Sequence, residues 1–370
     1  MKIMFVITGL GVGGAERQVV DLADKLAERG HSVKIAYLTG PVRLNPSNTA
    51  IEIFGLGINR SVISFSRGLF RLVSQLKDFK PDVVHSHMGH ANIISRLSRL
   101  FVDMPCLISS SHSVRDGGYF RALLYRVTDR LADISTNVGS EAVRAFEHKW
   151  AVPRGRMVSV VNGVDLSRFY EDENSRKLLR RSNGLGDRDK VVLAVGRFYK
   201  AKDYPNLLRA FSIVSKREGA VQLWIAGDGP LLLEMQGLAK DLHIDSVVKF
   251  LGVRKDIPDL MRLCDVFALS SEWEGLPLVV GEAMASSKVV VATDCGGVRE
   301  FLGDCGLLVS PRNHLELAEA LCSSLSLPPL QVKGLGQKAR ARIVECFSLE
   351  SAVNRWLAIY NDPASYLVRK

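Results

Sequence analysis

Residues 271–285 read SEWEGLPLVVGEAMA and follow the apolar run Val266–Leu269. The apolar run is typical of a buried parallel strand, and Pro277 suits the first position of a following helix. In an open α/β sheet, a strand, a polar loop and a helix in this order place ligands at the carboxyl end of the strand. Glu274 then lies on the loop and Glu282 about a turn and a half into the helix. Either the two acids bind a ligand, or they only complement the positive end of the helix dipole.

The same strand, loop and helix pattern recurs along the chain in two series. A length of 370 residues favours two domains. The polar segment 167–189 separates the series and is the expected link between a first domain, 1–166, and a second, 190–347. The predicted parallel strands are 2–7, 33–38, 81–87, 106–110 and 158–161 in the first domain, and 191–195, 222–226, 247–251, 266–269, 289–292 and 307–309 in the second. The fold class is therefore α/β with two doubly wound, Rossmann-like sheets.

The composition is that of a globular protein, with 47% hydrophobic and 24% charged residues. No apolar run approaches the ~18 residues that cross a bilayer. The apolar N-terminus lacks a small-residue cleavage site, so we interpret it as a strand and expect a cytoplasmic protein. The six cysteines form no C-x-x-C pair, which favours reduced thiols over a disulfide framework or a structural metal site.

The net charge of +10 is concentrated in the first half of the chain. Residues 1–166 contain 21 Lys and Arg against 14 Asp and Glu, or +7, and the remainder contains 28 against 25, or +3. Such a charge attracts nucleic acid, anionic lipid or a phosphorylated substrate. The absence of an interleaved aromatic and basic stripe disfavours nucleic acid. A basic amphipathic helix around 65–79 either rests on a membrane surface or simply covers a sheet.

A glycine loop follows the first predicted strand. Gly9, Gly11 and Gly14 match G-x-G-x-x-G, whose amides and helix N-terminus suit a pyrophosphate. The second strand ends Tyr37-Leu38-Thr39-Gly40 without the acid that a dinucleotide ribose requires. This disfavours a nicotinamide or flavin cofactor. The remaining alternatives are another phosphorylated ligand or a tight turn that binds nothing.

Four histidines of the first domain lie in predicted strands or just after them. His85, His87 and His90 are not accompanied by a carboxylate or cysteine set, which disfavours zinc. His112 follows the predicted strand 106–110 and belongs to the same layer as the glycine loop. It is either a structural or a catalytic residue.

The first loop of the second domain carries Arg197 and Lys202 ahead of another helix N-terminus. Arginine offers a bidentate fork and lysine a point charge, so the pair is a candidate anion clamp. It also lies at the carboxyl end of a parallel strand, as Glu274 does.

With these features in this order, the sequence resembles the retaining glycosyltransferases of family 4, which have the GT-B fold of two Rossmann-like domains facing a central cleft. The resemblance covers nearly the whole chain. It rests on Gly13-Gly14-Ala15-Glu16, Asn162-Gly163-Val164-Asp165, Gly196-Arg197 with Lys202, Ala226-Gly227-Asp228-Gly229-Pro230, and Glu274 followed by Glu282. Two departures are Ser287 and Val289, where relatives commonly have glycine and proline.

The resemblance implies a donor site in the second domain. Arg197 and Lys202 hold the donor diphosphate, with help from the backbone amides of Leu278 and Val279, and Val253 lies near the base. Glu282 binds the ribose hydroxyls, and Glu274 binds hydroxyls of the transferred sugar without being assigned as a nucleophile. From the first domain, Gly13, Gly14 and His112 face the sugar and diphosphate, so the domains must close for catalysis. The last helix, 348–370, is expected to cross back to the first domain.

The resemblance further implies a metal-independent, retaining transfer without a cofactor. The donor is a nucleotide-diphosphate sugar, UDP rather than GDP, and the acceptor is a growing glycan of lipopolysaccharide, O-antigen, capsule or exopolysaccharide, carried on a lipid. We expect peripheral contact with anionic lipids at the inner face of the membrane. The alternatives are a sugar-nucleotide epimerase of the same fold and a nucleotide-sugar-binding protein without catalysis.

Overall fold

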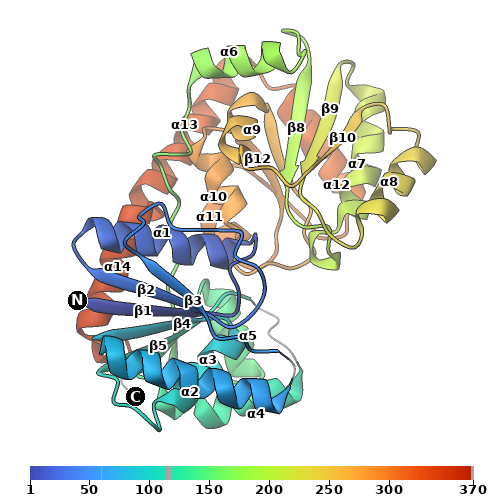
Figure 1. Ribbon diagram of the computed structural model, residues 1–370. Coiled ribbons are helices and arrows are strands. Elements are labelled where there is room, and N and C mark those ends of the chain that lie inside the picture. Colours follow the sequence, from blue (N-terminus) through green and yellow to red (C-terminus); the bar gives the residue numbers. More distant parts are fainter. Residues whose placement is uncertain (60, 114–117, 368–370) are drawn as a thin grey trace. The chain divides into compact units, whose positions relative to one another are not determined.

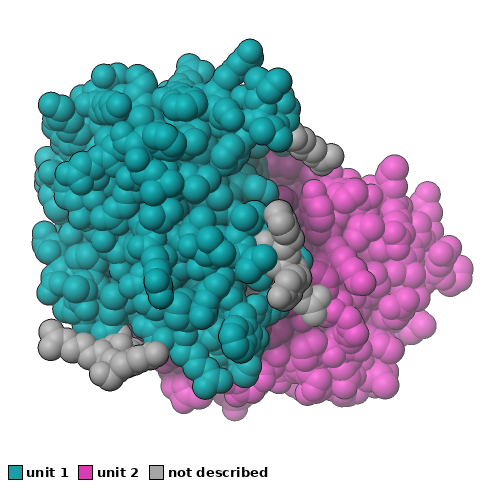
Figure 2. Space-filling model, turned by 90° about the horizontal axis from the view of Figure 1, so that it is seen from below, with its two compact units in different colours: residues 1–163, 349–370 teal, residues 164–348 magenta. Residues whose placement is uncertain are grey.

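A computed structural model describes residues 1–59, 61–113 and 118–367, and the chain forms two compact units. Unit 1 comprises Met1–Gly163 and Leu349–Lys370, and unit 2 comprises Val164–Ser348 (Figure 2). Each unit is built on a parallel sheet with helices on its faces (Figure 1). In the described residues, no helix is both long and apolar enough to cross a bilayer.

The sheet of unit 1 has the strand order β3-β2-β1-β4-β5-β6-β7, and all described pairings are parallel. The chain runs outward from β1 to one edge and then returns to build the other half. This reversal places the switch point of the sheet between β1 and β4. The strands are β1 Lys2–Ile7, β2 Ser32–Tyr37, β3 Glu52–Gly55, β4 Val83–His87, β5 Cys106–Ser111, β6 Ile134–Asn137 and β7 Met157–Ser159.

Helices cover both faces of this sheet, because side chains alternate along each strand. Ile3, Phe5 and Ile7 of β1 share a core with α1 and α14, whereas Met4 and Val6 share another with α2 and α3 (Figure 1). The helices of unit 1 are α1 Gly14–Glu28, α2 Val62–Phe79, α3 Gly89–Ser98, α4 Tyr119–Thr128, the short η1 Asp129–Leu131, α5 Ser140–His148, α14 Leu349–Asn361 and the short η3 Pro363–Tyr366.

The sheet of unit 2 has the order β10-β9-β8-β11-β12-β13, again with parallel pairings. Its switch point lies between β8 and β11, which are neighbours. The loops after these two strands therefore meet at one edge of the sheet. The strands are β8 Lys190–Val195, β9 Val221–Ala226, β10 Val248–Gly252, β11 Val266–Leu269, β12 Val289–Thr293 and β13 Leu307–Val309.

The helices of unit 2 also pack on the sheet. Residues of α7, α8 and α12 form one core with Val192 and Ala194 of β8, and α10 and α13 pack on each other and on β12. The helices are α6 Glu173–Ser182, the short η2 Lys200–Lys202, α7 Tyr204–Arg217, α8 Leu232–Asp241, α9 Ile257–Leu263, α10 Leu278–Ala285, α11 Val298–Leu302, α12 His314–Leu325 and α13 Pro329–Cys346.

The segment expected to be a link has a structure of its own. Within 167–189, α6 packs on α9 as part of unit 2. Arg176 donates to the carbonyl oxygens of Arg262, Leu263 and Cys264 at 2.6–2.9 Å, so it caps the C-terminus of α9. A charged residue of the segment that was expected to be a linker thus binds the end of α9 and holds α6 against it.

The strand β6 was not predicted, and neither was the edge strand β3. Strand β3 has only four residues, and none of them is fully buried, so the apolar signal is weak. The departure at Ser287 has a local consequence: this residue takes a left-handed φ of 57° in the turn before β12. Glycine adopts that conformation without strain, which is why a serine there is a real difference.

Candidate functional site

A short ion pair joins the two predicted loops at the switch point of unit 2. Lys202 Nζ donates to Glu274 Oε1 at 2.5 Å, and Ser271 Oγ donates to the same oxygen at 2.6 Å. The Lys202 and Glu274 side chains are 20% and 14% exposed. A partly buried carboxylate with two donors on one oxygen is oriented by its neighbours, and its other oxygen remains available for further hydrogen bonds.

Backbone contacts hold these loops together. Glu272 N donates to Ala201 O at 2.8 Å, and Ser270 Oγ donates to Lys202 O at 2.8 Å. On the other side, Gly297 N donates to Gly275 O at 2.6 Å. The loops after β8, β11 and β12 therefore form one connected rim around Glu274.

Arg197 lies on the same rim. Its guanidinium carbon is 4.9 Å from the centre of the Tyr199 ring, a cation–π contact. Tyr204 Oη donates to Gly196 O at 2.8 Å and fixes the start of the loop. Gly227, with a φ of 150°, passes so close to Gly196 that a Cβ there would overlap its carbonyl group. Gly227, in the turn after β9, is thus explained by close backbone packing.

Glu274 lies on the loop before α10, and Glu282 lies within α10. Pro277 is the N-cap of α10, and Leu278 and Val279 are its first residues, so their amides have no partner within the helix. Glu282 lies in the second turn. Gly281, beside it, faces Val164 and Phe301 too closely to admit a Cβ, which pins this turn. Val253 follows β10 on the same edge of the sheet and is 52% exposed.

A pair of histidines occupies the corresponding edge of unit 1. His87, at the end of β4, and His112, just after β5, lie 2.9 Å apart between Nδ1 and Nε2. Burial lowers the pKa of His112 to about 4, and burial with the neighbouring imidazoles holds the pKa of His87 well below its usual value. Both rings are therefore neutral at neutral pH.

Hydroxyl and imidazole groups extend this pair into a network without formal charge. His85 bonds through Nδ1 to Tyr360 Oη at 2.8 Å and through Nε2 to Ser110 Oγ at 2.7 Å. Ser110 Oγ in turn bonds to Thr136 Oγ1 at 2.6 Å. Tyr360 belongs to α14, so the last helix of the chain contributes directly to this edge of unit 1.

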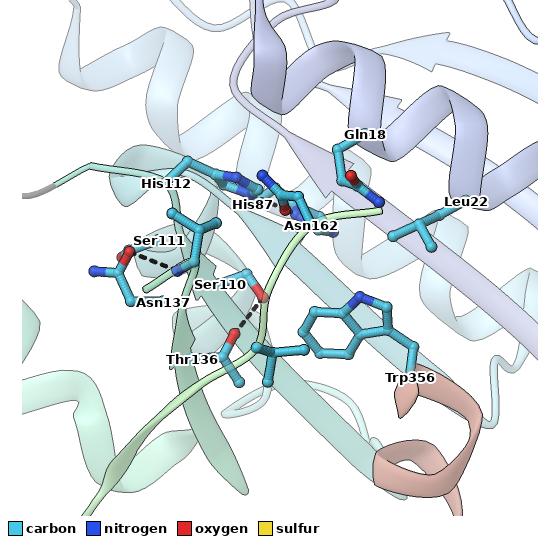
Figure 3. A pocket seen from close by; sticks show the side chains of 12 residues that line it. Gln18, Leu22, His87, Ser110, Ser111, His112, Thr136, Asn137, Asn162 and Trp356 are labelled. Atoms are coloured by element: carbon cyan, nitrogen blue, oxygen red, sulfur yellow. Dashed lines mark hydrogen bonds between the residues drawn. The ribbon is translucent and has the colours of Figure 1, made fainter. Parts of the chain in front are cut away.

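The network borders a narrow recess (Figure 3). Gln18 of α1 reaches into it, with Oε1 accepting from Gly163 N at 3.0 Å. The recess is lined by Gln18, Leu22, His87, Ser110, Ser111, His112, Thr136, Asn137, Val138, Val160, Asn162 and Trp356.

The glycine loop starts α1 in unit 1. Gly13 is the extended N-cap and Gly14 the first helical residue. The Glu16 carboxylate folds back over Gly13 so closely that a Cβ there would overlap it. The Glu16 side chain can turn aside, so this contact alone does not require glycine. It places a carboxylate at the N-terminus of α1, where the helix dipole is positive.

The structure brings the predicted site residues together in two groups, one in each unit. Gly13, Gly14 and His112 belong to unit 1. The residues of unit 2 are Arg197, Lys202, Val253, Glu274, Leu278, Val279 and Glu282. The sequence did not single out Gln18, Thr136, Trp356 or Tyr360, because each acquires its place only through the fold. Among the residues that the structure describes, no cluster of three His, Cys, Asp or Glu has the arrangement of a metal site.

Two family models match the chain. Residues 12–168 match Glycosyltransferase Family 4, and residues 175–342 match Glycosyl transferases group 1. The chain is 35% identical, over 92% of its length and 94% of the relative's, to N-acetylgalactosamine-N,N'-diacetylbacillosaminyl-diphospho-undecaprenol 4-alpha-N-acetylgalactosaminyltransferase of Campylobacter jejuni. It is 26% identical, over 98% of its length and 97% of the relative's, to N-acetyl-alpha-D-glucosaminyl L-malate synthase of Bacillus anthracis.

Solved structures show the same fold. The chain superposes on Anabaena HepE in complex with UDP with a TM-score of 0.84 and 20% identity, covering 98% of this chain and 100% of that one.

Proposed function

Because the chain belongs to the family 4 glycosyltransferases, which have the GT-B fold, we propose that it transfers a sugar from a nucleotide-diphosphate donor to a growing cell-surface glycan with retention of configuration. The observation that carries this proposal is the rim of unit 2, where Lys202 is bonded to Glu274, Arg197 lies on the same loop as Lys202, and α10 begins at Leu278. Cations, acids and free helix amides are the groups that a nucleotide sugar requires.

The cations of the rim bind the donor diphosphate in this proposal. As the glycosidic bond breaks, negative charge grows on the diphosphate, and fixed cations stabilise it most in that state. Lys202 is already held by Glu274, so it needs little reorganisation to meet an oxygen anion. With Arg197 and the amides of Leu278 and Val279, these charges supply what a divalent cation supplies in other transferases. We therefore propose a metal-independent enzyme without a cofactor.

The two acids bind hydroxyl groups. Glu282 accepts hydrogen bonds from the ribose, and Glu274 accepts them from the transferred sugar through its second oxygen. One Glu274 oxygen is bonded to both Lys202 and Ser271. Those bonds stabilise the carboxylate and reduce its nucleophilicity, which supports a binding and electrostatic role. Val253 lies beside the base, and UDP is the proposed nucleotide because HepE, of the same fold, was solved with UDP.

Unit 1 takes the acceptor side. We assign His112 a contact with the transferred sugar and Gly13 and Gly14 a contact with the diphosphate. The name of the Campylobacter jejuni relative describes an acceptor on undecaprenol diphosphate, which supports a lipid-linked acceptor here. The product glycan belongs to lipopolysaccharide, O-antigen, capsule or exopolysaccharide.

The exposed side of α2 supports peripheral contact with anionic lipids at the cytoplasmic face of the membrane. Ile63 and Phe70 are 66% and 61% exposed, and the Phe70 ring lies 5.9 Å from that of exposed Phe101. Arg67 and Arg71 are exposed on the same helix. Apolar side chains between arginines suit the interface of an anionic bilayer.

Incubation with nucleotide sugars and lipid-linked glycans, followed by mass spectrometry, tests the function. We expect a mass increase of one sugar on the acceptor, with release of the nucleoside diphosphate. Anomeric coupling constants of the product report retention. Full activity in EDTA supports metal independence. Conversion of labelled UDP-sugar to its epimer without an acceptor would contradict the transferase assignment.

A further inference from the structure

We propose that His87 is a positioning residue for His112: it fixes the orientation and tautomer of the His112 ring, so that Nδ1 of His112 is presented to a sugar hydroxyl. The inference rests on the proposed sugar transfer. It goes beyond it by assigning a role to a residue of β4 that has no predicted contact with the donor. Four observations carry it.

The two rings are coupled through one hydrogen bond. His87 Nδ1 and His112 Nε2 lie 2.9 Å apart, so one of them donates and the other accepts. In a neutral imidazole, a donor at one nitrogen requires an acceptor at the other. If His112 Nε2 donates, its Nδ1 accepts; if His87 Nδ1 donates, His112 Nδ1 donates as well. The tautomer of His87 therefore decides what His112 offers to a ligand.

His87 is the rigid member of the pair. It is 1% exposed and lies in β4, paired in register with Ile7 of β1 and Ser110 of β5. Its ring contacts those of His85 and Phe5, with centroids at 4.0 and 5.6 Å. His112, by contrast, follows the end of β5 on a loop. The orientation of His112 thus depends on His87, whose ring is held by its buried neighbours.

Three buried polar atoms at the recess lack a partner among the described residues. They are His112 Nδ1, His87 Nε2 and Gln18 Nε2, and all three residues line the recess (Figure 3). A buried polar atom without a partner destabilises the fold by roughly 1–3 kcal/mol. A hydroxyl group both donates and accepts, so it satisfies either tautomer at His112 and can also accept from the Gln18 amide.

His85 shows what a purely structural histidine looks like at the same place. It is fully buried two residues earlier in the same strand, and both of its ring nitrogens are bonded, to Tyr360 and Ser110. His87 and His112 each use one nitrogen for the other and leave the second nitrogen at the recess. His85 therefore has all its hydrogen bonds within the protein core, whereas His87 and His112 each have a nitrogen that can bond to a ligand.

The test compares His87→Phe with His87→Asn, which keeps a polar group near the Nδ1 position, and with His85→Asn as the matched buried control. We expect His87→Phe to lower kcat of transfer about 30-fold while the KM for the donor changes less than about threefold, since a small misplacement of a reacting group lowers the rate by up to ~10²-fold. His87→Asn should recover most of the loss. His85→Asn should lower the melting temperature without changing kcat of the folded enzyme.

Nitrogen NMR of ¹⁵N-histidine-labelled protein gives a readout that does not depend on activity. We expect the wild-type His112 nitrogens to show the two separate shifts of one tautomer, retained in His85→Asn and averaged in His87→Phe. Unchanged shifts in His87→Phe, or averaged shifts with unchanged kcat, would overturn the inference. If no nucleotide sugar is turned over by the wild type, the proposed function fails, and the shifts still decide whether His87 fixes the tautomer.

Discussion

The carboxyl ends of the two sheets have opposite chemistry. In unit 2 the loops after β8 and β11 present charges, with Lys202 bonded to Glu274 and Arg197 on the same loop as Lys202. In unit 1 the corresponding ends of β4 and β5 present neutral imidazole and hydroxyl groups, with His87 bonded to His112. Both sets lie at the carboxyl ends of parallel strands, the edge at which open α/β sheets bind ligands.

The difference shows how one architecture is adapted to two kinds of ligand group. Fixed charges suit a diphosphate, whose charge grows during the reaction. Neutral donors and acceptors suit hydroxyl groups, which need hydrogen bonds but no compensation of charge. A comparison of variants on the two edges should therefore separate effects on charge from effects on hydrogen bonding.

The largest effect is expected at Arg197. Arg197→Ala removes a fixed cation from the rim, and we expect kcat of transfer to fall by roughly 10²–10³-fold, the usual consequence of losing one group that stabilises transition-state charge. Steady-state assays of nucleotide release measure it. Arg188→Ala, an exposed arginine of the same unit, is the control and should remain at wild-type rates. Near-normal turnover in Arg197→Ala would contradict the proposal that the cations of the rim stabilise the transition state.

The buried, neutral His112 of unit 1 should make the stability of the protein depend on pH. Burial lowers the pKa of His112 from 6.5 to about 4, so below pH 6.5 the unfolded chain binds a proton that the folded chain does not. The contribution of neutral His112 to the free energy of unfolding is complete above pH 6.5. It falls by roughly 3 kcal/mol as the pH is lowered to about 4. His112→Asn should flatten the fall in urea midpoint between pH 7 and 4.5. If the urea midpoint of the variant falls with pH as steeply as that of the wild type, His112 is not the cause of the loss of stability.

The ribose contact predicts a smaller effect on binding. Glu282→Ala should weaken UDP binding about 20-fold, as expected for the loss of charge-assisted hydrogen bonds worth roughly 1.5–3 kcal/mol. Isothermal titration calorimetry measures it. The same variant should bind 2′,3′-dideoxy-UDP as the wild type does, because the hydroxyl partners are already missing. Equal weakening for both nucleotides would assign Glu282 to another part of the ligand.

The smallest effect is expected on the surface of unit 1. Arg71→Ala should reduce binding to vesicles of equal phosphatidylglycerol and phosphatidylcholine about fivefold, since one basic residue near an anionic surface contributes about 1 kcal/mol. Vesicle sedimentation measures it, with exposed Arg209→Ala of α7 as the control. Binding should weaken with salt and be absent on pure phosphatidylcholine. Binding that is indifferent to both salt and lipid charge would reject the membrane contact.

Most of the architecture was readable from local patterns. The strands at 2–7, 266–269 and 307–309 have the predicted ends, and the other predicted strands differ from the structure by a few residues. Apolar runs bounded by Gly, Pro and Asp carry this information in a few neighbouring residues. The exceptions are informative. The short edge strand β3 buries too little to leave a pattern, and the polar segment containing α6 looked like a linker because its contacts are made by arginines.

The sequence by itself determined which residues stand at the ends of the strands: Arg197, Lys202, Glu274 and His112 were named from their position after apolar runs. Only the tertiary structure decided how they pair. Lys202 meets Glu274 because β8 and β11 are neighbours, and His87 meets His112 because β4 and β5 are. Tyr360 reaches His85 across 275 positions of the chain because α14 packs with α1 on one face of the unit 1 sheet. Sheet order and side-chain packing are properties of the whole fold, so no local pattern encodes these contacts.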